Sequence, residues 1–323
     1  MKILLITYEG STPHQLKEEH IKKIQSIDPS TELYTFSAID TQEIEHHIRD
    51  ADIIAGFPRT IPSLENAKNL KWVHSFSAGM DRVLTPEFIN SPVLASNSSG
   101  IHATPLGEHV LGFMLLFTRK FYQTFQNQQR KIWQRDEGIT ELRGKTVLIA
   151  GLGHIGKEVA RLSRCFGIRV FAIDTPGKEK PEFVEELGSE ADFSSFLPKA
   201  DFVVLCLPHT KETHHFFGKD HFSRMKPTAV LINIGRGGLV DEKELIDALQ
   251  KKIIGGAAVD VTETEPLPRE SPLWEMENVI ITPHHSGLSE KYMDRATEQF
   301  CVNLEAFLKG EPLPNLVDKT AGY

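Results

Sequence analysis

Short apolar segments alternate with amphipathic helical segments along most of the 323-residue chain, and this pattern constrains the fold more than any single motif. In the first hundred residues, helical patterns run from about residue 13 to 26 and from 41 to 50. The strands predicted around them are residues 3–7, 33–36, 52–56 and 72–76. Strands that alternate with helices predict a parallel sheet covered on both faces.

A second, more regular alternation follows a long apolar helical pattern over residues 102–117 and a polar stretch over 123–141. Its predicted strands are rich in Val and Ile, which is typical of strands buried on both faces. They span residues 146–150, 169–173, 202–206, 229–234, 256–260 and 279–282. Six parallel strands separated by helices predict a doubly wound sheet.

A last helical pattern, residues 291–308, follows the sixth of these strands and is surplus to the second sheet. We therefore expect the chain to return to its first domain. The predicted fold class is α/β with two doubly wound parallel-sheet domains, one formed by residues 1–98 and 289–323 and the other by residues 99–288. Two domains suit this length, because single cores stop growing at roughly 250–300 residues.

Composition excludes several classes of protein. The formal net charge of -8 argues against nucleic acid as the main partner. Cys165, Cys206 and Cys301 form no CxxC pair, so a disulfide framework and a structural zinc site are not expected. The first apolar run is broken by Glu9 and is too short for a signal peptide, and no segment approaches the roughly 20 apolar residues of a membrane span. We expect a cytoplasmic protein without a membrane partner.

Three glycines directly after the predicted strand 146–150 match the pattern GxGxxG, and a helical pattern follows them. Gly151 allows a tight turn, Gly153 lets the backbone approach a pyrophosphate, and Gly156 lets the helix pack closely on the strand. A glycine-rich turn of some other α/β protein is the alternative. The strand before the motif and the helix after it favour a dinucleotide site.

The residues around these glycines specify the nucleotide further. The amides of His154 and Ile155 are predicted at the positive end of a helix dipole, where an anion is stabilised. Asp174 ends the next predicted strand, at the roughly 20-residue spacing of the fingerprint. Its carboxylate would accept hydrogen bonds from the ribose hydroxyls and repel a 2′-phosphate. No arginine stands at 175–177, although two lysines are near, so NAD is favoured over NADP.

Several further motifs stand in one order along the chain. They are residues 148–156, 206–210, 232–241, 259–268 and 282–287, preceded by residues 77–81 and by Asn97, Gly100 and Glu108. In this order and spacing the chain resembles the D-isomer-specific 2-hydroxyacid dehydrogenase family over nearly its whole length. The resemblance implies a Rossmann NAD-binding domain over 99–288, a flavodoxin-like substrate domain over the rest, and a homodimer.

The resemblance assigns the family's catalytic arginine, glutamate and histidine to Arg236, Glu265 and His284. Hydride transfer to a 2-keto acid leaves negative charge on the carbonyl oxygen, and histidine is the side chain suited to protonate it near neutral pH. A carboxylate beside the imidazole favours its charged form. Arginine offers a planar fork that matches a substrate carboxylate or carbonyl oxygen. All three residues follow predicted strands, at the sheet edge where doubly wound folds bind ligands.

The same resemblance implies the remaining contacts. A loop whose backbone amides hold the substrate carboxylate corresponds to Ser77, Ala78, Gly79 and Met80. The other implied cofactor contacts are Leu207, Pro208, Thr210, Ile234, Asp260, Ser286 and Gly287. Arg59 and Arg82 are candidates for binding an additional anionic group, and Trp133 for a dimer interface or a pocket wall. The loop at residues 77–79 could also be a plain strand-to-helix turn, and Arg59 and Arg82 could be ordinary surface residues.

Other interpretations remain at this point. His284 by itself could be a loop histidine, and the histidines that compete for the acid/base role are His209, His214, His215 and His285. A nucleotide-sensing corepressor could keep the dinucleotide motif without turnover, whereas the three charged residues together favour an enzyme. A formate dehydrogenase would pair its histidine with glutamine, and Glu265 speaks against it. Glyoxylate, hydroxypyruvate, pyruvate and phosphorylated acids all remain candidate substrates.

Overall fold

The computed structural model describes residues 1–8, 14–80 and 82–320, which form two compact units. The first consists of Met1–His102 and Leu288–Tyr323, and the second of Ala103–Gly287. The predicted boundaries fell after residues 98 and 288. None of the helices formed by the described residues is long and apolar enough to cross a bilayer.

The first unit contains a five-stranded parallel sheet in the order β2-β1-β3-β4-β5, which confirms a doubly wound, flavodoxin-like arrangement. Its strands are β1 (Lys2–Thr7), β2 (Glu32–Ser37), β3 (Ile53–Gly56), β4 (Trp72–Ser75) and β5 (Leu94–Asn97). Strand β5 is absent from the sequence prediction. Its last two residues, Ser96 and Asn97, are polar, and they are buried because neighbouring strands and loops supply their hydrogen-bond partners.

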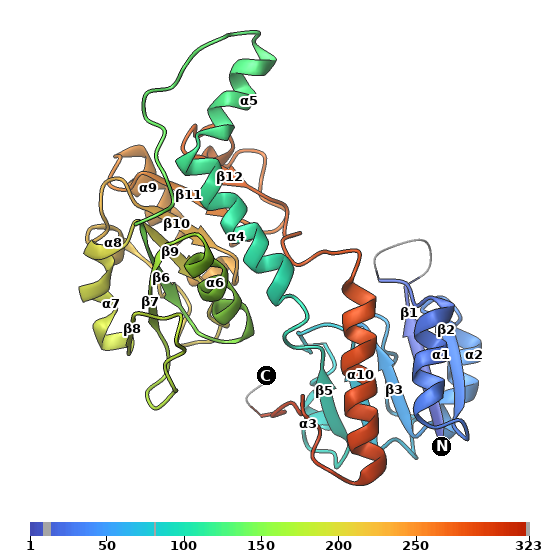
Figure 1. Ribbon diagram of the computed structural model, residues 1–323. Helices are drawn as coiled ribbons and strands as arrows, with labels where there is room; N and C mark the ends of the chain where they lie inside the picture. Colours follow the sequence, from blue (N-terminus) through green and yellow to red (C-terminus); the bar gives the residue numbers. More distant parts are fainter. Residues whose placement is uncertain (9–13, 81, 321–323) are drawn as a thin grey trace. The chain divides into compact units, whose positions relative to one another are not determined.

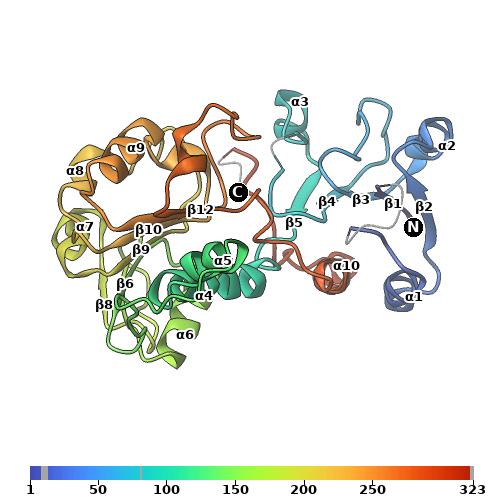
Figure 2. The same cartoon turned by 90° about the horizontal axis from the view of Figure 1, so that it is seen from above.

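Helices cover both faces of this sheet (Figure 2). They are α1 (Glu18–Ile27) and α10 (Tyr292–Lys309) on one face, and α2 (Thr41–His47), the 3-10 turn η1 (Ile48–Asp50) and α3 (Pro86–Ile89) on the other. Alternate residues of β1 explain why. Ile3 and Leu5 pack in the core that includes Phe300 of α10, whereas Leu4 and Ile6 pack in the opposite core. The last helix therefore belongs to the first unit, as expected.

The start of α1 differs from the prediction. The helix begins at Glu18, whereas the sequence pattern placed its start near Pro13, which lies outside the described residues. Residues 14–17 lie before the helix, and the side chain of His20 accepts a hydrogen bond from the amide of Lys17. That bond satisfies a backbone donor ahead of the first turn, so the helix begins later than the periodicity of the sequence indicates.

The second unit contains a seven-stranded parallel sheet in the order β12-β11-β10-β9-β6-β7-β8 (Figure 1). The strands are β6 (Thr146–Ala150), β7 (Arg169–Ile173), β8 (Glu186–Gly188), β9 (Phe202–Leu205), β10 (Val230–Asn233), β11 (Gly256–Val259) and β12 (Val279–Ile281). The predicted number of six strands is wrong, because β8 was missed. This edge strand has only three residues and no apolar run, so nothing local distinguishes it from a loop.

Two layers of helices enclose this sheet as well (Figure 2). Helices α4 (Ala103–Thr118) and α6 (His154–Cys165) contribute to one core, and α7 (Glu190–Phe196), α8 (Lys219–Phe222) and α9 (Glu242–Gln250) to the other. The remaining elements are α5 (Phe121–Gln129) and the 3-10 turns η2 (Leu197–Lys199), η3 (Gly237–Leu239) and η4 (Pro272–Glu275). Strand β6 divides the two cores: Val147 faces the core of α4 and α6, and Leu148 faces the other.

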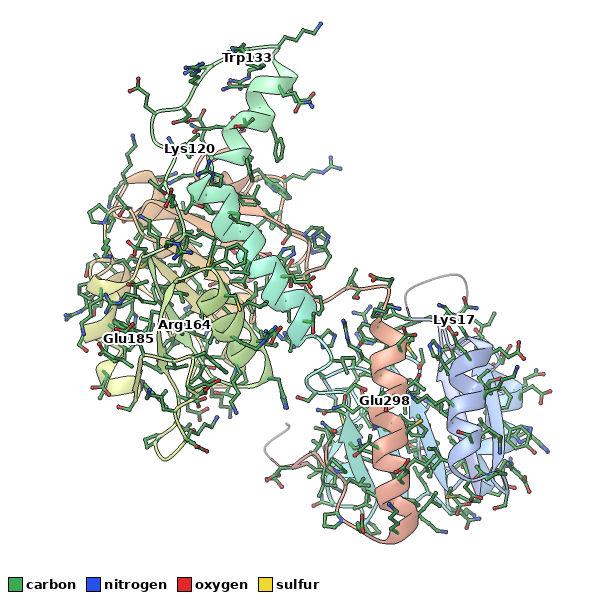
Figure 3. All side chains as sticks on the ribbon, in the orientation of Figure 1. Lys17, Lys120, Trp133, Arg164, Glu185 and Glu298 are labelled. Carbon is green, nitrogen blue, oxygen red and sulfur yellow. The ribbon has the colours of Figure 1, made fainter. Side chains whose placement is uncertain are left out.

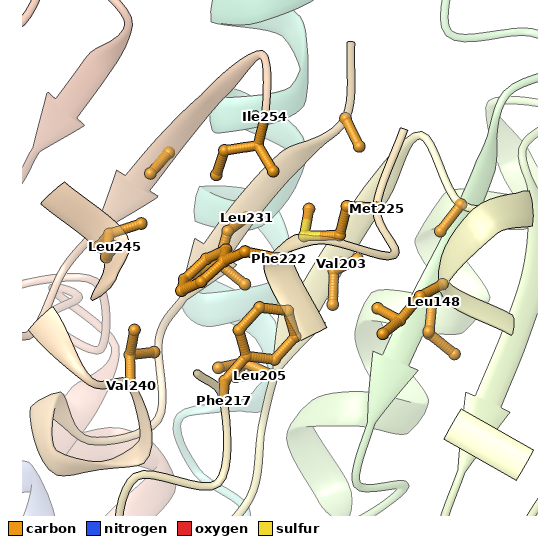
Figure 4. Close-up of a cluster of buried hydrophobic side chains, with 14 of the residues drawn as sticks. Leu148, Val203, Leu205, Phe217, Phe222, Met225, Leu231, Val240, Leu245 and Ile254 are labelled. Atoms are coloured by element: carbon orange, nitrogen blue, oxygen red, sulfur yellow. The ribbon is translucent and has the colours of Figure 1, made fainter. Parts of the chain in front are cut away.

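The core of α7, α8 and α9 combines buried phenylalanines with aliphatic side chains (Figure 4). Phe217 and Phe222 are fully buried there, and their rings meet edge to face with centroids 4.9 Å apart. Leu205 and Leu231, from neighbouring strands, pack in the same cluster. This packing fixes the strands whose carboxyl ends carry the predicted site.

A polar arm, residues 119–141, extends from the end of α4 and includes α5 (Figure 1). Trp133 lies in this arm and is 99% exposed (Figure 3). Phe125 and Ile132 of the arm are exposed as well. The arm thus presents large apolar side chains to solvent.

Candidate active site

Every site residue predicted in the second unit follows the carboxyl end of a strand. Strand order reverses between β6 and β9, and ligands of doubly wound sheets bind at such a switch point. Residues 151–156 follow β6, and residues 207–210 follow β9. The loops after β10, β11 and β12 carry the three predicted catalytic residues.

The glycine loop has the backbone geometry that its motif implies. Gly151 adopts a φ of 95°, which favours glycine, and a Cβ at Gly156 would overlap the carbonyl oxygen of Gly151. A Cβ at Gly153, by contrast, would meet no atom within 4 Å. Gly153 is exposed and caps α6 without a side-chain hydrogen bond, and His154 and Ile155 begin the helix. The loop therefore leaves room for a phosphate at a helix N-terminus.

Asp174 follows β7 and faces this loop. Its Oδ2 accepts a hydrogen bond of 2.8 Å from the amide of Leu152, and its Oδ1 accepts one of 2.6 Å from the amide of Thr175. Lys178 pairs with the same carboxylate at 2.9 Å. Burial alone would raise the pKa of Asp174, but these hydrogen bonds hold it below the usual range. Asp174 is therefore an anion that backbone hydrogen bonds orient against the glycine loop.

Glu265 and His284 are brought together from loops after different strands. Nδ1 of His284 lies 2.7 Å from Oε2 of Glu265. The histidine has a φ of 50°, an uncommon backbone conformation for a residue with a side chain and one that is found at functional sites. Its amide donates to the carbonyl of Asp260 at 2.9 Å, which holds the turn.

The two ring nitrogens distinguish His284 from its competitors. Among the residues that the structure describes, Nε2 of His284 has no hydrogen-bond partner, so it is free to meet a ligand. His215 also pairs with a carboxylate, at 2.7 Å from Glu263, but its other nitrogen faces Asp241 at 3.8 Å. His209 and His214 lie near each other, with ring nitrogens 3.1 Å apart. Only His284 combines one carboxylate contact with one open nitrogen in this group.

Arg236 lies in the loop after β10 and is exposed. Its Nη1 donates to the carbonyl of Gly235 at 2.8 Å, and no carboxylate among the described residues lies within ion-pair distance of its guanidinium. The adjacent Gly237 packs so closely on Thr262 that a Cβ there would overlap the threonine carbonyl. This contact joins the loop of Arg236 to the loop that carries Glu265.

Asp260 anchors the segment that carries His284. The carboxylate is 3% exposed and accepts hydrogen bonds from the hydroxyls of Thr282 and Ser286 and from the amides of His285 and Ser286. Nε2 of His109, on α4, lies 3.2 Å from the Thr282 hydroxyl. His109 is absent from the predicted site, and Thr282 was predicted only as the first residue of the motif 282–287, because nothing local pairs a helix residue with a loop 173 residues away.

The remaining predicted cofactor residues lie at the same edge. Ile234 is buried directly after β10, and Leu207 is partly buried after β9. Pro208 and Thr210 belong to a turn in which the Thr213 hydroxyl donates to the Pro208 carbonyl and accepts from the Thr210 amide, both at 2.7 Å. Gly287 ends the unit and is partly exposed.

The predicted substrate loop, residues 77–80, belongs to the first unit and follows β4. All four of its carbonyls accept hydrogen bonds. The Asn97 side chain donates to the carbonyl of Ala78 at 2.7 Å, and the hydroxyls of Ser75 and Ser77 both donate to that of Gly79 at 3.1 Å. In the part of the chain that the structure describes, the amides of Ala78, Gly79 and Met80 have no acceptor. The loop therefore offers backbone donors to an anion.

The structure says little about the role of the remaining predicted residues. Arg59 and Arg82 are both exposed. Asp81, the last residue of the motif that begins at Ser77, lies outside the described residues.

The sequence of the chain matches one known protein family. The sequence model of the D-isomer specific 2-hydroxyacid dehydrogenase NAD binding domain matches residues 111–286. A glyoxylate reductase of Korarchaeum cryptofilum is 32% identical over 285 residues, which are 85% of this chain and 85% of that enzyme.

Two solved structures are similar over the whole chain. A D-isomer specific 2-hydroxyacid dehydrogenase family protein of Aeromonas salmonicida is 30% identical, with a TM-score of 0.85 and coverage of 98% of this chain and 99% of that one. The NADPH-dependent glyoxylate/hydroxypyruvate reductase of Sinorhizobium meliloti, in complex with NADP and sulfate, is 28% identical, with a TM-score of 0.80 and coverage of 100% and 99%. The chain therefore belongs to the D-isomer specific 2-hydroxyacid dehydrogenase family.

Proposed function

We propose that the protein transfers a hydride between NAD(H) and a small D-2-hydroxy acid or the corresponding 2-keto acid. The observation that carries this proposal is the pairing of His284 with Glu265, which leaves one ring nitrogen open at the ligand-binding edge of the sheet. Arg236, whose guanidinium has no carboxylate partner among the described residues, lies on a loop packed against the loop of Glu265. A proton donor beside a group that binds carboxylates is what the reduction of a 2-keto acid requires.

The residues of this chain have separate tasks in that reaction. Bound NADH would supply the hydride. In the direction of reduction, His284 holds a proton at Nε2 and gives it to the carbonyl oxygen, and Glu265 stabilises the imidazolium through Nδ1. Arg236 binds the substrate carboxylate or polarises the carbonyl. In the direction of oxidation, the same imidazole accepts the hydroxyl proton.

For the first unit, we propose that residues 77–80 bind the substrate carboxylate through backbone amides. Support comes from the hydrogen bonds of the loop: its carbonyls accept hydrogen bonds within the protein, whereas the amides of Ala78, Gly79 and Met80 have no acceptor among the residues that the structure describes. Oriented amides that cost no reorganisation bind an anion well. Asn97 acts here as a positioning residue, because it holds the carbonyl of Ala78.

The proposed cofactor is NAD rather than NADP. The open space at Gly153 and the free start of α6 suit a pyrophosphate, and Asp174 suits the ribose hydroxyls. A 2′-phosphate beside the Asp174 carboxylate would be repelled. The Sinorhizobium meliloti enzyme is NADPH-dependent, so the preference has to be measured for this chain. Lys178, which pairs with Asp174, is a candidate cation for contacting such a phosphate.

A panel of 2-keto acids, followed by the absorbance of NADH with NADPH in parallel, tests this function directly. We expect turnover of glyoxylate, hydroxypyruvate or a related small 2-keto acid, with a higher kcat/KM for NADH. Phosphohydroxypyruvate belongs in the panel, because the exposed Arg59 and Arg82 are candidate partners for a further anionic group. Tight NADH binding without turnover of any acid would contradict the enzyme and favour a nucleotide-sensing protein.

We also propose a homodimer in which the arm, residues 119–141, contributes to the interface. The support is the exposure of large apolar side chains on the arm, with Trp133 at 99%. Replacing Trp133 by Ser should raise the dimer dissociation constant by about 30-fold or more, since buried tryptophans are common hot spots. Sedimentation velocity measures this. Trp274→Ser is the matched control, because Trp274 is 51% exposed but lies outside the arm. An unchanged dimer in the Trp133 variant would contradict the role of the arm.

A further inference from the structure

Three potential metal ligands from separate elements meet in the second unit. His109 comes from α4, Asp260 follows β11, and His285 follows β12. One ligand atom from each lies within 4.8 Å of the other two, and the two imidazole rings have centroids 5.6 Å apart. We propose that these three residues bind a divalent transition-metal ion such as Zn²⁺.

The donor set suits zinc. Two imidazole nitrogens and one carboxylate oxygen are ligands that zinc prefers, and three protein ligands with one open position are typical of its non-structural sites. Bonds of about 2.0–2.1 Å in a tetrahedron would put the ligand atoms about 3.4 Å apart. The cluster therefore has to contract, and His285 is exposed and free to turn toward the other two ligands.

The charge of the cluster also favours a cation. Asp260 is buried, and its carboxylate accepts hydrogen bonds from the hydroxyls of Ser286 and Thr282 and from backbone amides, which stabilise its anionic form. No lysine or arginine among the described residues pairs with Asp260. A buried anion thus faces two imidazoles and no permanent cation.

The hydrogen bonds around Asp260 would support such a site. Thr282 donates its only hydroxyl proton to Asp260 at 2.6 Å, so the same hydroxyl accepts from Nε2 of His109 at 3.2 Å. A metal would replace that long hydrogen bond and keep the short one. Outer partners of this kind orient the carboxylate and strengthen binding.

His285 is what makes the cluster a site, because its side chain makes no hydrogen bond within the described part of the chain. The scattered cysteines excluded a structural zinc site in the sequence analysis, but this cluster uses no cysteine. Because the third ligand, His285, is exposed, the ion would exchange with solvent. It would therefore affect the activity of the folded protein and would not be needed for folding.

The experiment measures binding of Zn²⁺ to the purified full-length protein in competition with a chromophoric chelator. We expect one ion per chain. His285→Asn should weaken binding by at least about tenfold, because it removes a direct ligand and even outer partners contribute that much. The variant should fold normally, because the His285 side chain is exposed and its backbone bond to Asp260 is kept. Co²⁺ in place of Zn²⁺ should give the visible absorption of a tetrahedral site, and His285→Asn should remove it.

A matched control is His214→Asn, which changes an exposed histidine of the His209–His214 pair, outside the proposed ligand set. It should leave zinc binding unchanged. Absence of binding would overturn the proposal, and so would binding that survives His285→Asn and disappears in His214→Asn. Binding that survives both would place the ion elsewhere, for example at Glu19, His20 and Asp294, and would also overturn it.

A second measurement rests on the proposed function, in which Asp260 orients the nicotinamide. NADH should then compete with Zn²⁺, and zinc should inhibit turnover competitively with NADH. Zinc binding that depends on His285 without any competition would support the metal site and contradict the role of Asp260 in cofactor binding. The two proposals can therefore fail separately.

Discussion

The two sheets place histidine in opposite environments. His74, in β4 of the first unit, is fully buried, and its ring nitrogens lie 2.7 Å from the Ser96 hydroxyl and 3.2 Å from the Ser98 hydroxyl. His284, after β12 of the second unit, is exposed and has one carboxylate neighbour and one open nitrogen. The neighbours of each ring, rather than the residue type, decide what it can do.

The hydrogen bonds around His74 are compatible with a neutral ring. The Trp72 indole donates to Ser96, and in the neutral form the Ser96 proton goes to Nδ1 of the histidine. Nε2 then donates to Ser98, whose own proton goes to the carbonyl of Ser75. Burial lowers the pKa of His74 to about 3, in agreement with this assignment. In the first unit a histidine is thus a structural element close to the proposed substrate loop, whereas in the second unit His284 is the proposed proton carrier.

The largest test of this contrast is His284→Ala. Loss of a general acid should lower kcat for keto acid reduction by about 10²–10⁴-fold, while NADH still binds. Steady-state assays of NADH oxidation measure kcat, and fluorescence titration with NADH measures the affinity for the cofactor. His215→Ala is the matched control, because this histidine also pairs with a glutamate but has no open nitrogen. Equal losses in the two variants, or a matching loss of NADH affinity, would break the contrast.

Glu265→Gln sharpens the role of the carboxylate neighbour. Glutamine can keep the hydrogen bond to His284 but not the charge that favours the imidazolium, so kcat should fall by about 10–100-fold, less than in His284→Ala. Steady-state kinetics at saturating NADH give the comparison. A kcat equal to that of the wild type would mean that the negative charge of Glu265 does not contribute to the role of His284.

The pH dependence of stability tests the other side of the contrast. His74 titrates near 6.5 when unfolded and at about 3 when folded, so the unfolded chain binds more protons between these values. Its contribution to stability is complete above pH 6.5 and is lost as the pH falls. Between pH 7 and 5 the loss should be about 2 kcal/mol. Urea unfolding at pH 7 and at pH 5 measures the free energy of unfolding. Its decrease between the two pH values should be smaller by about 2 kcal/mol in His74→Asn than in the wild type. The same decrease in both proteins would refute the assignment.

The smallest expected effect concerns Asp174. Its carboxylate follows β7 in the second unit and transfers no proton in the proposed reaction. Asp174→Ser should lower the ratio of kcat/KM with NADH to kcat/KM with NADPH by about tenfold. This change corresponds to the loss of one repulsive contact of about 1.4 kcal/mol. Parallel assays with both cofactors measure it. Lys178→Ala should change the ratio in the opposite direction, because it removes the cation beside Asp174. A ratio that stays constant in Asp174→Ser would remove this residue from cofactor selection.

Several features were predictable because they are local. The strands 146–150 and 169–173 match β6 and β7 at both ends, since a buried parallel strand is a continuous apolar run closed by a glycine or a charged residue. The glycine loop and Asp174 could be identified for the same reason, as spacing along one βαβ unit fixes their positions. Strands β5 and β8 could not, because their residues become strand only by pairing with a neighbour.

The sequence by itself determined the two parallel sheets, the dinucleotide loop and which residues could carry the chemistry, because each follows from periodicity or from short-range spacing. Tertiary structure decided which of the candidate histidines has, among the described residues, an open nitrogen beside a carboxylate, and it placed His74 in a buried hydrogen-bond network. It also brought His109 to Asp260 and His285. Those outcomes depend on contacts between residues that are far apart in the chain, and burial and hydrogen bonding at such contacts are not written in any local pattern.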